Sequence, residues 1–295
     1  MKKIFSIIIS LSVLLSLAAC GTPSNSDVQT PSNVSPDSSS SQQGTINSKD
    51  ASIVETILLD EAGVKITAKS LGDSMWGSEV KILIENNSEK NLTVQARNSS
   101  INGYMVENML SADVAAGKKA NDSITFMSSD MELCGIEAIA SMEFSFHIFT
   151  TDDWETYLDT SVIQLKTSIA DTYTQTYDDS GDVAYDKSGV KIVIKGLSTD
   201  DSLLGPSILV YIENNSQQNI TVQTRDVSIN DFMLDPIFSC DVAPGKRAVD
   251  TITFMSSELE DNNISAIETV ELSFHIFDYS DWETIADTDT ITIDF

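Results

Sequence analysis

The sequence predicts an all-β protein in which two tandem antiparallel β-sandwich domains follow an export signal and a flexible tether. Two observations carry this prediction. The chain from about residue 51 aligns with itself at an offset of 126 to 128, and apolar residues within each copy alternate with polar ones. In addition, no segment of either copy keeps a helical apolar stripe for more than two turns. The expected organisation is a signal peptide (1–19), a tether that begins at Cys20 (20–50), a first repeat (51–167), a linker (168–176) and a second repeat (177–295).

The N-terminus has the three parts of an export signal. Lys2 and Lys3 precede an apolar run over residues 4–17, and small residues follow. The run is interrupted by serines and is shorter than the roughly 20 apolar residues of a bilayer span. The segment 17–20, Leu-Ala-Ala-Cys, resembles the bacterial lipobox. This resemblance implies that the thiol of Cys20 carries lipid, so we expect a membrane anchor on the extracytoplasmic face, at the cell surface.

Residues 21–50 are mostly Ser, Pro, Thr, Asn, Gln and Asp, which cannot form a core, so we expect this tether to stay disordered. As a flexible coil it would span about 30 Å.

The chain is strongly acidic. Its formal net charge is -28, and loss of Lys2 and Lys3 would bring it to -30, with 15 basic against 45 acidic residues. Such a field repels nucleic acid and anionic lipid, so we exclude both as partners. The ordinary role of this charge is to keep an extracellular protein soluble.

Cys134 and Cys240 could form one bridge between the two copies. They occupy non-equivalent positions, whereas a structural framework places its cysteines at matching sites. We therefore expect them not to pair.

The repeat has the length of a duplicated domain. Residues 63–66 recur as 189–192, and residues 85–88 recur as 213–216, so the second copy carries two extra residues near 199–203. Each copy of about 115 residues lies in the range of an independent domain, whereas solenoid units run about 20–50 residues.

Within each copy the residues predict short strands and tight turns. Phe144, Phe146 and Ile148 alternate with polar neighbours, which is typical of a half-buried strand. Asn102-Gly103 is a favoured two-residue hairpin turn, and Asn230-Asp231 answers it in the second copy. Residues 243–246 place proline and glycine as a type II turn requires, and the best helical candidate is a short turn over residues 129–136.

About seven short strands in about 115 residues favour a sandwich of immunoglobulin type. The strand end at 85–88, the turn at 242–246 and a Phe-His-Ile-Phe strand closed by Asp-Trp-Glu-Thr are similar to the uncharacterised immunoglobulin-like modules of Gram-positive surface lipoproteins. The resemblance implies fold and location, and it brings no functional residues with it.

Two motifs were weighed as catalytic or metal sites. Residues 72–75, Gly-Asp-Ser-Met, resemble the nucleophile block of certain serine esterases, but neither His147 nor His275 follows the Asp-x-x-His pattern of that chemistry, so we expect a loop. One histidine per domain is a poor transition-metal site, and we expect packed or hydrogen-bonded surface imidazoles.

Acidic loops supply calcium's ligand types but not the spacing of a calcium-binding loop with its central glycine. The first loop contains Asp152, Asp153 and Glu155, matched by Ser280, Asp281 and Glu283, and a further run contains Asp178, Asp179 and Asp182. Calcium is therefore conceivable but not favoured, and we predict no metal.

The candidate partner-binding residues are His147, His275 and two further pairs. Arg97 and Arg225 face outward, either in surface ion pairs with Asp113 and Asp241 or as ligand contacts. Trp154 and Trp282 lie in the Asp-Trp-Glu-Thr loops, either as plugs over the open end of a sandwich or as exposed interaction anchors.

Phosphate loops, zinc-protease helices, paired thiols and dinucleotide-binding turns are absent from the sequence. We therefore predict a non-enzymatic, cofactor-free binding or protein-interaction module, with an envelope protein or cell-wall component as its partner. The alternatives are a structural spacer or accessory subunit of an envelope complex and, more remotely, a secreted hydrolase.

Overall fold

A computed structural model describes residues 51–198 and 204–295. The predicted signal peptide, Cys20, the tether and the predicted two-residue insertion near 199–203 lie outside the described residues. Both repeats belong to one compact unit, Gly44–Phe295. Within the described residues, no helix is both long enough and apolar enough to cross a membrane.

The protein is all-β, as predicted, and its described residues form antiparallel sheets and two short helices. The elements of the first repeat are β1 (Thr56–Glu61), β2 (Val64–Asp73), β3 (Ser78–Asn86), β4 (Leu92–Ile101), β5 (Tyr104–Met105), β6 (Asn108–Met109), β7 (Ser111–Val114), β8 (Lys119–Phe126), α1 (Ser128–Leu133), β9 (Ser141–Thr150), β10 (Thr156–Asp159) and β11 (Ile163–Lys166). Those of the second are β12 (Asp182–Lys187), β13 (Val190–Ser198), β14 (Ser207–Asn214), β15 (Ile220–Ile229), β16 (Phe232–Met233), β17 (Ser239–Val242), β18 (Arg247–Thr253), α2 (Ser256–Asp261), β19 (Thr269–Asp278), β20 (Thr284–Asp287) and β21 (Ile291–Asp294).

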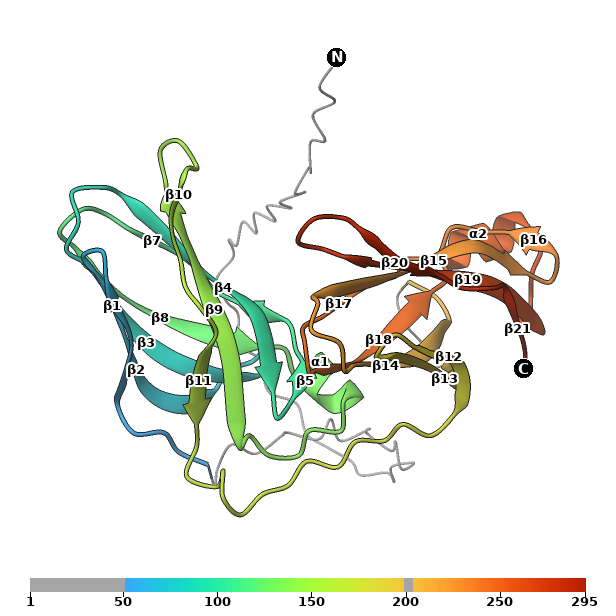
Figure 1. The fold of residues 1–295 in the computed structure, drawn as a ribbon, viewed down its shortest axis with the longest axis horizontal. Helices are drawn as coiled ribbons and strands as arrows, with labels where there is room; N and C mark the ends of the chain where they lie inside the picture. Colours follow the sequence, from blue (N-terminus) through green and yellow to red (C-terminus); the bar gives the residue numbers. More distant parts are fainter. Residues whose placement is uncertain (1–50, 199–203) are drawn as a thin grey trace, which may run out of the picture. The chain divides into compact units, whose positions relative to one another are not determined.

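Each repeat contributes strands to two sheets (Figure 1). In the first repeat, β1, β2, β3, β8 and β6 form one sheet, and β9 and β4 lie at the centre of the other, where β10 and β11 pair with β9 and β7 pairs with β4. The second repeat repeats this pattern, with β12, β13, β14 and β18 in one sheet and β15 and β19 central in the other. Inward-facing residues between the sheets form two hydrophobic cores.

The second repeat also packs against the first. A parallel pairing of Tyr104 with Arg247 joins β5 to β18, so that strands of both repeats form one ten-stranded sheet. Val193, Tyr211 and Val249 project from the β13–β14–β18 sheet into the core of the first repeat. This face of the second repeat is therefore covered by protein and not by solvent.

The local predictions from turn chemistry are confirmed. Asn102 and Gly103 have φ of 50° and 89°, the left-handed values that a two-residue hairpin needs, and Asn230 and Asp231 have φ of 49° and 70°. Gly245 has φ of 71° in the predicted type II turn. The predicted helical turn at 129–136 is observed as α1.

The C-terminus departs in part from the alternation in the sequence. The pattern predicts that the last strand runs to the final residue with Phe295 facing inward. The structure ends β21 at Asp294 and leaves Phe295 44% exposed, while Ile291 and Ile293 pack against the second core. The backbone of Phe295 still bonds to the neighbouring segment, since its N–H donates to Glu268 O at 2.9 Å, while its side chain lies partly in solvent.

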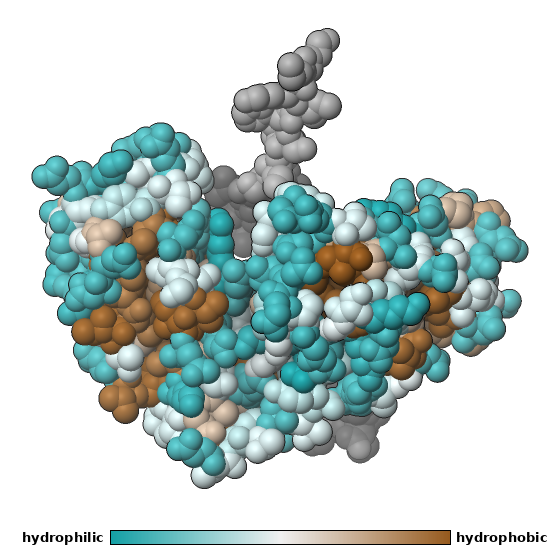
Figure 2. Space-filling view, in the orientation of Figure 1, coloured by the Kyte–Doolittle hydropathy of each residue, from teal (hydrophilic) through white to brown (hydrophobic). Residues whose placement is uncertain are grey.

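Most of the surface seen in Figure 2 is hydrophilic, with hydrophobic residues in separate patches, as the acidic composition leads us to expect.

Candidate functional site

One outward-facing surface keeps ten residues unchanged between the two repeats, although Asn98, Thr151 and Asp152 beside them are replaced by Asp226, Tyr279 and Ser280. It lies on β7, β4, β9 and β10 and on the loop that joins β9 to β10, and we call it the retained strip. In the first repeat its residues are Thr93, Gln95, Arg97, Ser111, Asp113, Ser145, His147, Phe149, Trp154 and Asp159. In the second they are Thr221, Gln223, Arg225, Ser239, Asp241, Ser273, His275, Phe277, Trp282 and Asp287.

A stack of aromatic rings forms the first part of the strip. The indole of Trp154 lies on the ring of Phe149, with the ring centroids 5.4 Å apart and the planes 17° apart, and the imidazole of His147 lies 5.3 Å from the same phenyl ring. Phe149 is only 5% exposed, whereas Trp154 is 75% exposed. The tryptophan therefore covers the phenylalanine and remains largely in solvent itself.

The second repeat reproduces this stack. Trp282 lies on Phe277 with centroids 5.4 Å apart and planes at 14°, His275 lies 5.2 Å from Phe277, and Trp282 is again 75% exposed. The expectation that these tryptophans plug the open end of a sandwich is wrong, because a plug would be buried. Each Trp instead folds back over a phenylalanine that faces outward from the sheet.

Both tryptophans have a left-handed backbone. Their φ angles are 60° for Trp154 and 66° for Trp282, a region that bulky residues rarely adopt. The loop between β9 and β10 enforces it, because Trp154 N donates to Thr150 O and Thr150 N donates to Glu155 O, both at 2.9 Å. Glycine or asparagine would fit here with less strain, yet both repeats have tryptophan.

The histidines belong to hydrogen-bonded pairs. His147 Nδ1 lies 2.5 Å from Asp159 Oδ1, and His275 Nδ1 lies 2.6 Å from Asp287 Oδ1. The cross-strand register that brings each pair together is the same in both repeats. The predicted hydrogen-bonded surface imidazole is confirmed, and Asp159 remains 63% exposed and open to a ligand.

The arginines are not in the ion pairs offered as one explanation for them. Arg97 Nη2 donates to Gln95 Oε1 at 3.2 Å, while Asp113 Oδ1 accepts from Thr93 Oγ1 at 2.6 Å. The second repeat has the same bonds, with Arg225 donating to Gln223 and Thr221 donating to Asp241. Asp113 is therefore engaged by a threonine hydroxyl, because β7 places it opposite Thr93 in the register.

Other outward positions differ between the repeats. On β11, which pairs with β9 in the same sheet, Gln164 and Lys166 are exposed, and their counterparts on β21 are Thr292 and Asp294. On the opposite sheet the differences are larger and include Lys81 to Leu209, Leu83 to Tyr211 and Asn121 to Val249. Packing accounts for the differences on this opposite sheet, because Tyr211 and Val249 of the second repeat contact the core of the first repeat.

All six residues proposed from the sequence lie in the retained strip, three in each repeat. The sequence analysis missed Phe149 and Asp159 with their counterparts Phe277 and Asp287. These residues could have been found as outward-facing positions that carry the same residue in both repeats. The strand register is needed to know which positions face outward. Their role in binding stays a prediction. Cys20, the predicted lipidation site, lies outside the described residues.

The acidic loops are engaged in local bonds. Asp153 accepts a hydrogen bond from Thr150 Oγ1, which lowers the pKa of its carboxyl. Asp178 accepts from Ser180 and Lys195, which hold its pKa well below its ordinary value, and Asp179 pairs with Lys191. In residues 51–198 and 204–295, no group of three or more His, Cys, Asp or Glu side chains is arranged to hold a metal ion.

The esterase-like segment forms the tip of the β2–β3 hairpin, as the predicted loop requires. Ser74 Oγ donates to Gly77 O at 2.9 Å, so the hydroxyl is committed to the turn.

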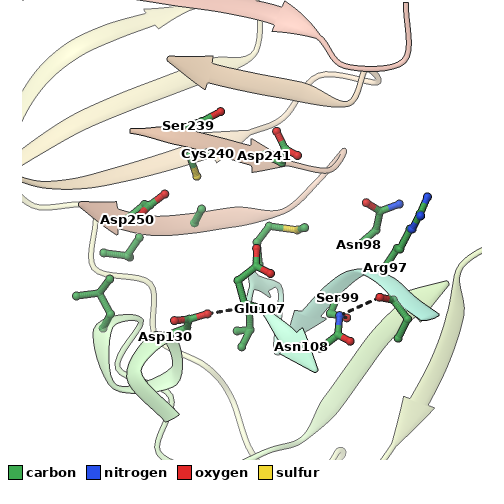
Figure 3. A pocket seen from close by; sticks show the side chains of 16 residues that line it. Arg97, Asn98, Ser99, Glu107, Asn108, Asp130, Ser239, Cys240, Asp241 and Asp250 are labelled. Carbon is green, nitrogen blue, oxygen red and sulfur yellow. Dashed lines mark hydrogen bonds between the residues drawn. The ribbon is translucent and has the colours of Figure 1, made fainter. Parts of the chain in front are cut away.

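A second candidate site is a cavity of about 450 Å³ between residues of β4, β5, β17 and β18. Figure 3 shows Glu107 and Asp130 on one side and Asp250 on the other, with Arg97 at one end. Burial raises the pKa of Glu107 and of Asp250, and neighbouring carboxylates add to the effect. Acidic groups dominate this cavity.

Cys134 and Cys240, the cysteines of the described residues, are buried and are not bonded to each other. Burial raises the pKa of the Cys134 thiol to about 12 and raises that of Cys240 well above its ordinary value. Such thiols remain protonated at neutral pH and do not act as nucleophiles.

The sequence matches no protein-family model and no curated protein. Among solved structures, the chain is similar to the crystal structure of the YadV chaperone, with 11% sequence identity and a TM-score of 0.23, over 74% of this chain and 92% of that one. At this TM-score the likeness is too weak to support an argument.

Proposed function

We propose that the protein is a non-enzymatic binding protein, anchored by lipid on Cys20 at the extracytoplasmic face of the membrane, and that the retained strip of each repeat is its binding surface. Two antiparallel sheets in each repeat support the assignment of two tandem immunoglobulin-like sandwiches. The lipobox-like segment 17–20 supports the anchor.

The retention of the strip is the observation that carries this proposal. Solvent-facing residues usually drift after a duplication, because few of them affect stability. Gln164 and Lys166 illustrate that drift within the same sheet. The strip also faces solvent, yet its aromatic, basic and acidic residues are the same in both copies. Exposed residues kept in this way indicate binding.

A spacer would need two folded repeats but no common surface, so the strip argues against the main alternative. A hydrolase of the serine type would need a hydroxyl bonded to the histidine of a His–Asp pair. No hydroxyl bonds to the ring of His147 or His275 in the part of the chain that the structure describes.

Binding to isolated cell envelopes tests the proposal. We expect the Trp154→Ala, Trp282→Ala double variant to bind envelopes at least 10-fold more weakly, because truncation of an aromatic anchor costs about 2 kcal/mol or more. The matched control is Trp76→Ala, which removes a tryptophan that is 52% exposed but lies outside the strip. Equal binding by the double variant and the control, with unchanged thermal melts, would rule out the strip as the binding surface.

A further inference from the structure

We infer that each retained strip binds a glycan of pyranose units, neutral or amine-bearing, with Trp154 and Trp282 as stacking platforms. This inference rests on the proposed function and specifies its ligand.

The platform is a flat indole with one covered face. Trp154 covers Phe149 with one face, since Phe149 is nearly buried while the indole is 75% exposed. The opposite face of the indole is left to solvent. A pyranose ring presents C–H groups on its faces, and these stack on an aromatic ring in the way that other apolar groups do.

The backbone indicates that the side chain is needed. A left-handed φ at a bulky residue costs of order 1–3 kcal/mol, and both repeats accept this cost for a tryptophan that adds little to the core. Burial of Phe149 alone would be served by smaller apolar residues. An exposed indole held rigidly in the same orientation in two copies is what a stacking site requires.

Polar groups beside the platform match the edge of a sugar ring, whose hydroxyls both donate and accept hydrogen bonds. The exposed carboxylate of Asp159 accepts, and its bond to His147 fixes the position of both groups. Gln95 lies opposite His147 in the register, and Arg97 donates to Gln95. The strip thus offers donors and acceptors on the two strands that flank β9, which carries His147 and Phe149 of the aromatic stack.

Charge selects the class of glycan. Asp153 and Glu155 flank Trp154 in the sequence, Asp281 and Glu283 flank Trp282, and the chain as a whole carries a formal charge of -28. A phosphate-bearing or carboxylate-bearing polymer would be repelled at both platforms. Neutral sugars pay no such penalty, and an amino sugar would gain from the carboxylates and from the indole face.

Two equivalent platforms favour a polymer over a single sugar. If both engage one glycan chain, the second contact becomes intramolecular, and avidity exceeds the affinity of either site by about 10²–10⁴ where the geometry allows. We therefore expect weak binding of a disaccharide and much tighter retention on a polymer.

Tryptophan fluorescence of the purified full-length chain in detergent tests the inference. The Trp76→Phe background leaves Trp154 and Trp282 as the fluorophores, because the sequence has three tryptophans. The probes are hexamers of N-acetylglucosamine, glucose and glucosamine, with choline as a cation that lacks a sugar ring. We expect at least one hexamer to shift the emission to the blue, and we expect the Trp154→Ala, Trp282→Ala variant to lose at least 10-fold retention on the corresponding insoluble polymer.

The outcomes separate this inference from the proposed function. Binding of choline without any hexamer, or no response to any probe while envelope binding still depends on the two tryptophans, would overturn the glycan assignment and leave the proposed function standing. Polymer retention that survives the double substitution would overturn the platform. If neither envelope nor polymer binding depends on the tryptophans, both proposals fail.

Discussion

A buried asparagine makes the same side-chain hydrogen bonds in both repeats. Asn86 is buried at the end of β3, and its side chain donates to the carbonyls of Lys90 and Val114 and accepts from both the backbone N–H and the hydroxyl of Ser88. Asn214 makes the equivalent four bonds in the second repeat. The recurrent Glu-Asn-Asn-Ser therefore organises the turn that follows the strand.

Asn86→Leu should destabilise the protein by roughly 1–3 kcal/mol for each buried partner that is left unsatisfied. Urea unfolding followed by circular dichroism measures the loss. Asn87→Leu is the control, because the neighbouring side chain is exposed and its replacement should change the free energy of unfolding by less than about 0.5 kcal/mol. Equal effects of the two substitutions would show that the bonds of Asn86 contribute little.

At this scale the sequence supplied the candidate residues but not their surroundings. Trp154, His147 and Arg97 stand out by type and by recurrence. That Trp154 folds back onto Phe149 depends on the bonds of the loop between Thr150 and Glu155, and such a loop conformation leaves no trace in the alternation of apolar and polar residues.

Secondary-structure elements were predictable where their causes are local. Turn chemistry located the hairpins at Asn102-Gly103 and Asn230-Asp231, and two-residue alternation located the long strands. The very short strand β6 was not predictable, because it is defined by its pairing with β8, which lies further along the chain. The parallel pairing of β5 with β18 is of this kind.

Gly77, in the turn between β2 and β3, offers a test at the scale of elements. It precedes β3 with φ of 148°, and a Cβ there would lie 2.0 Å from Phe126 O, a backbone atom that cannot move aside easily. Gly77→Ala should therefore destabilise the first repeat by more than the ~1 kcal/mol of an ordinary glycine substitution. Gly72→Ala is the control, since the nearest atom to its Cβ would be Lys81 Cε at 3.8 Å. A melt of Gly77→Ala that matches the control would contradict this account.

At the scale of the whole molecule, the duplication could be predicted from the sequence, but the contact between the two repeats could not be predicted. Val193, Tyr211 and Val249 look like ordinary strand residues until the structure places them in the core of the first repeat. The comparison of equivalent faces is therefore informative only with the structure in hand. Contact with the first repeat explains why the outer face of the β13–β14–β18 sheet differs from its counterpart. Solvent exposure alone does not explain why the residues of the retained strip are the same in both repeats.

The proposed membrane attachment depends on residues that lie outside the part of the chain that the structure describes. Cys20→Ala should prevent lipidation and leave the protein unprocessed or released from the membrane. Fractionation with immunoblotting, together with metabolic labelling by a fatty acid, measures both effects. A Cys20→Ala protein that is matured and membrane-bound at the level of the parent would refute the lipobox assignment.

The acidic cavity where the repeats meet makes stability depend on pH. Burial raises the pKa of Glu107 and of Asp250, and the carboxylates of Asp130 and Asp241 add to the shift of Glu107. The native state therefore binds protons more tightly than the unfolded state at these two groups. In the window between the ordinary and raised pKa values, their contribution to stability increases as pH falls, and at neutral pH both charges destabilise the fold.

Asp250→Asn and Glu107→Gln should each raise the melting temperature at pH 7, because each removes a buried charge that neighbouring acids oppose. The gain should shrink as pH falls and vanish below the ordinary pKa values of 3.8 and 4.5, where the parent side chains are protonated in both states. Melts from pH 3 to pH 8 measure this, with Glu89→Gln, at an exposed acid, as the control for net charge. A gain that is independent of pH, or equal to that of the control, would show that the cavity does not destabilise these carboxylates.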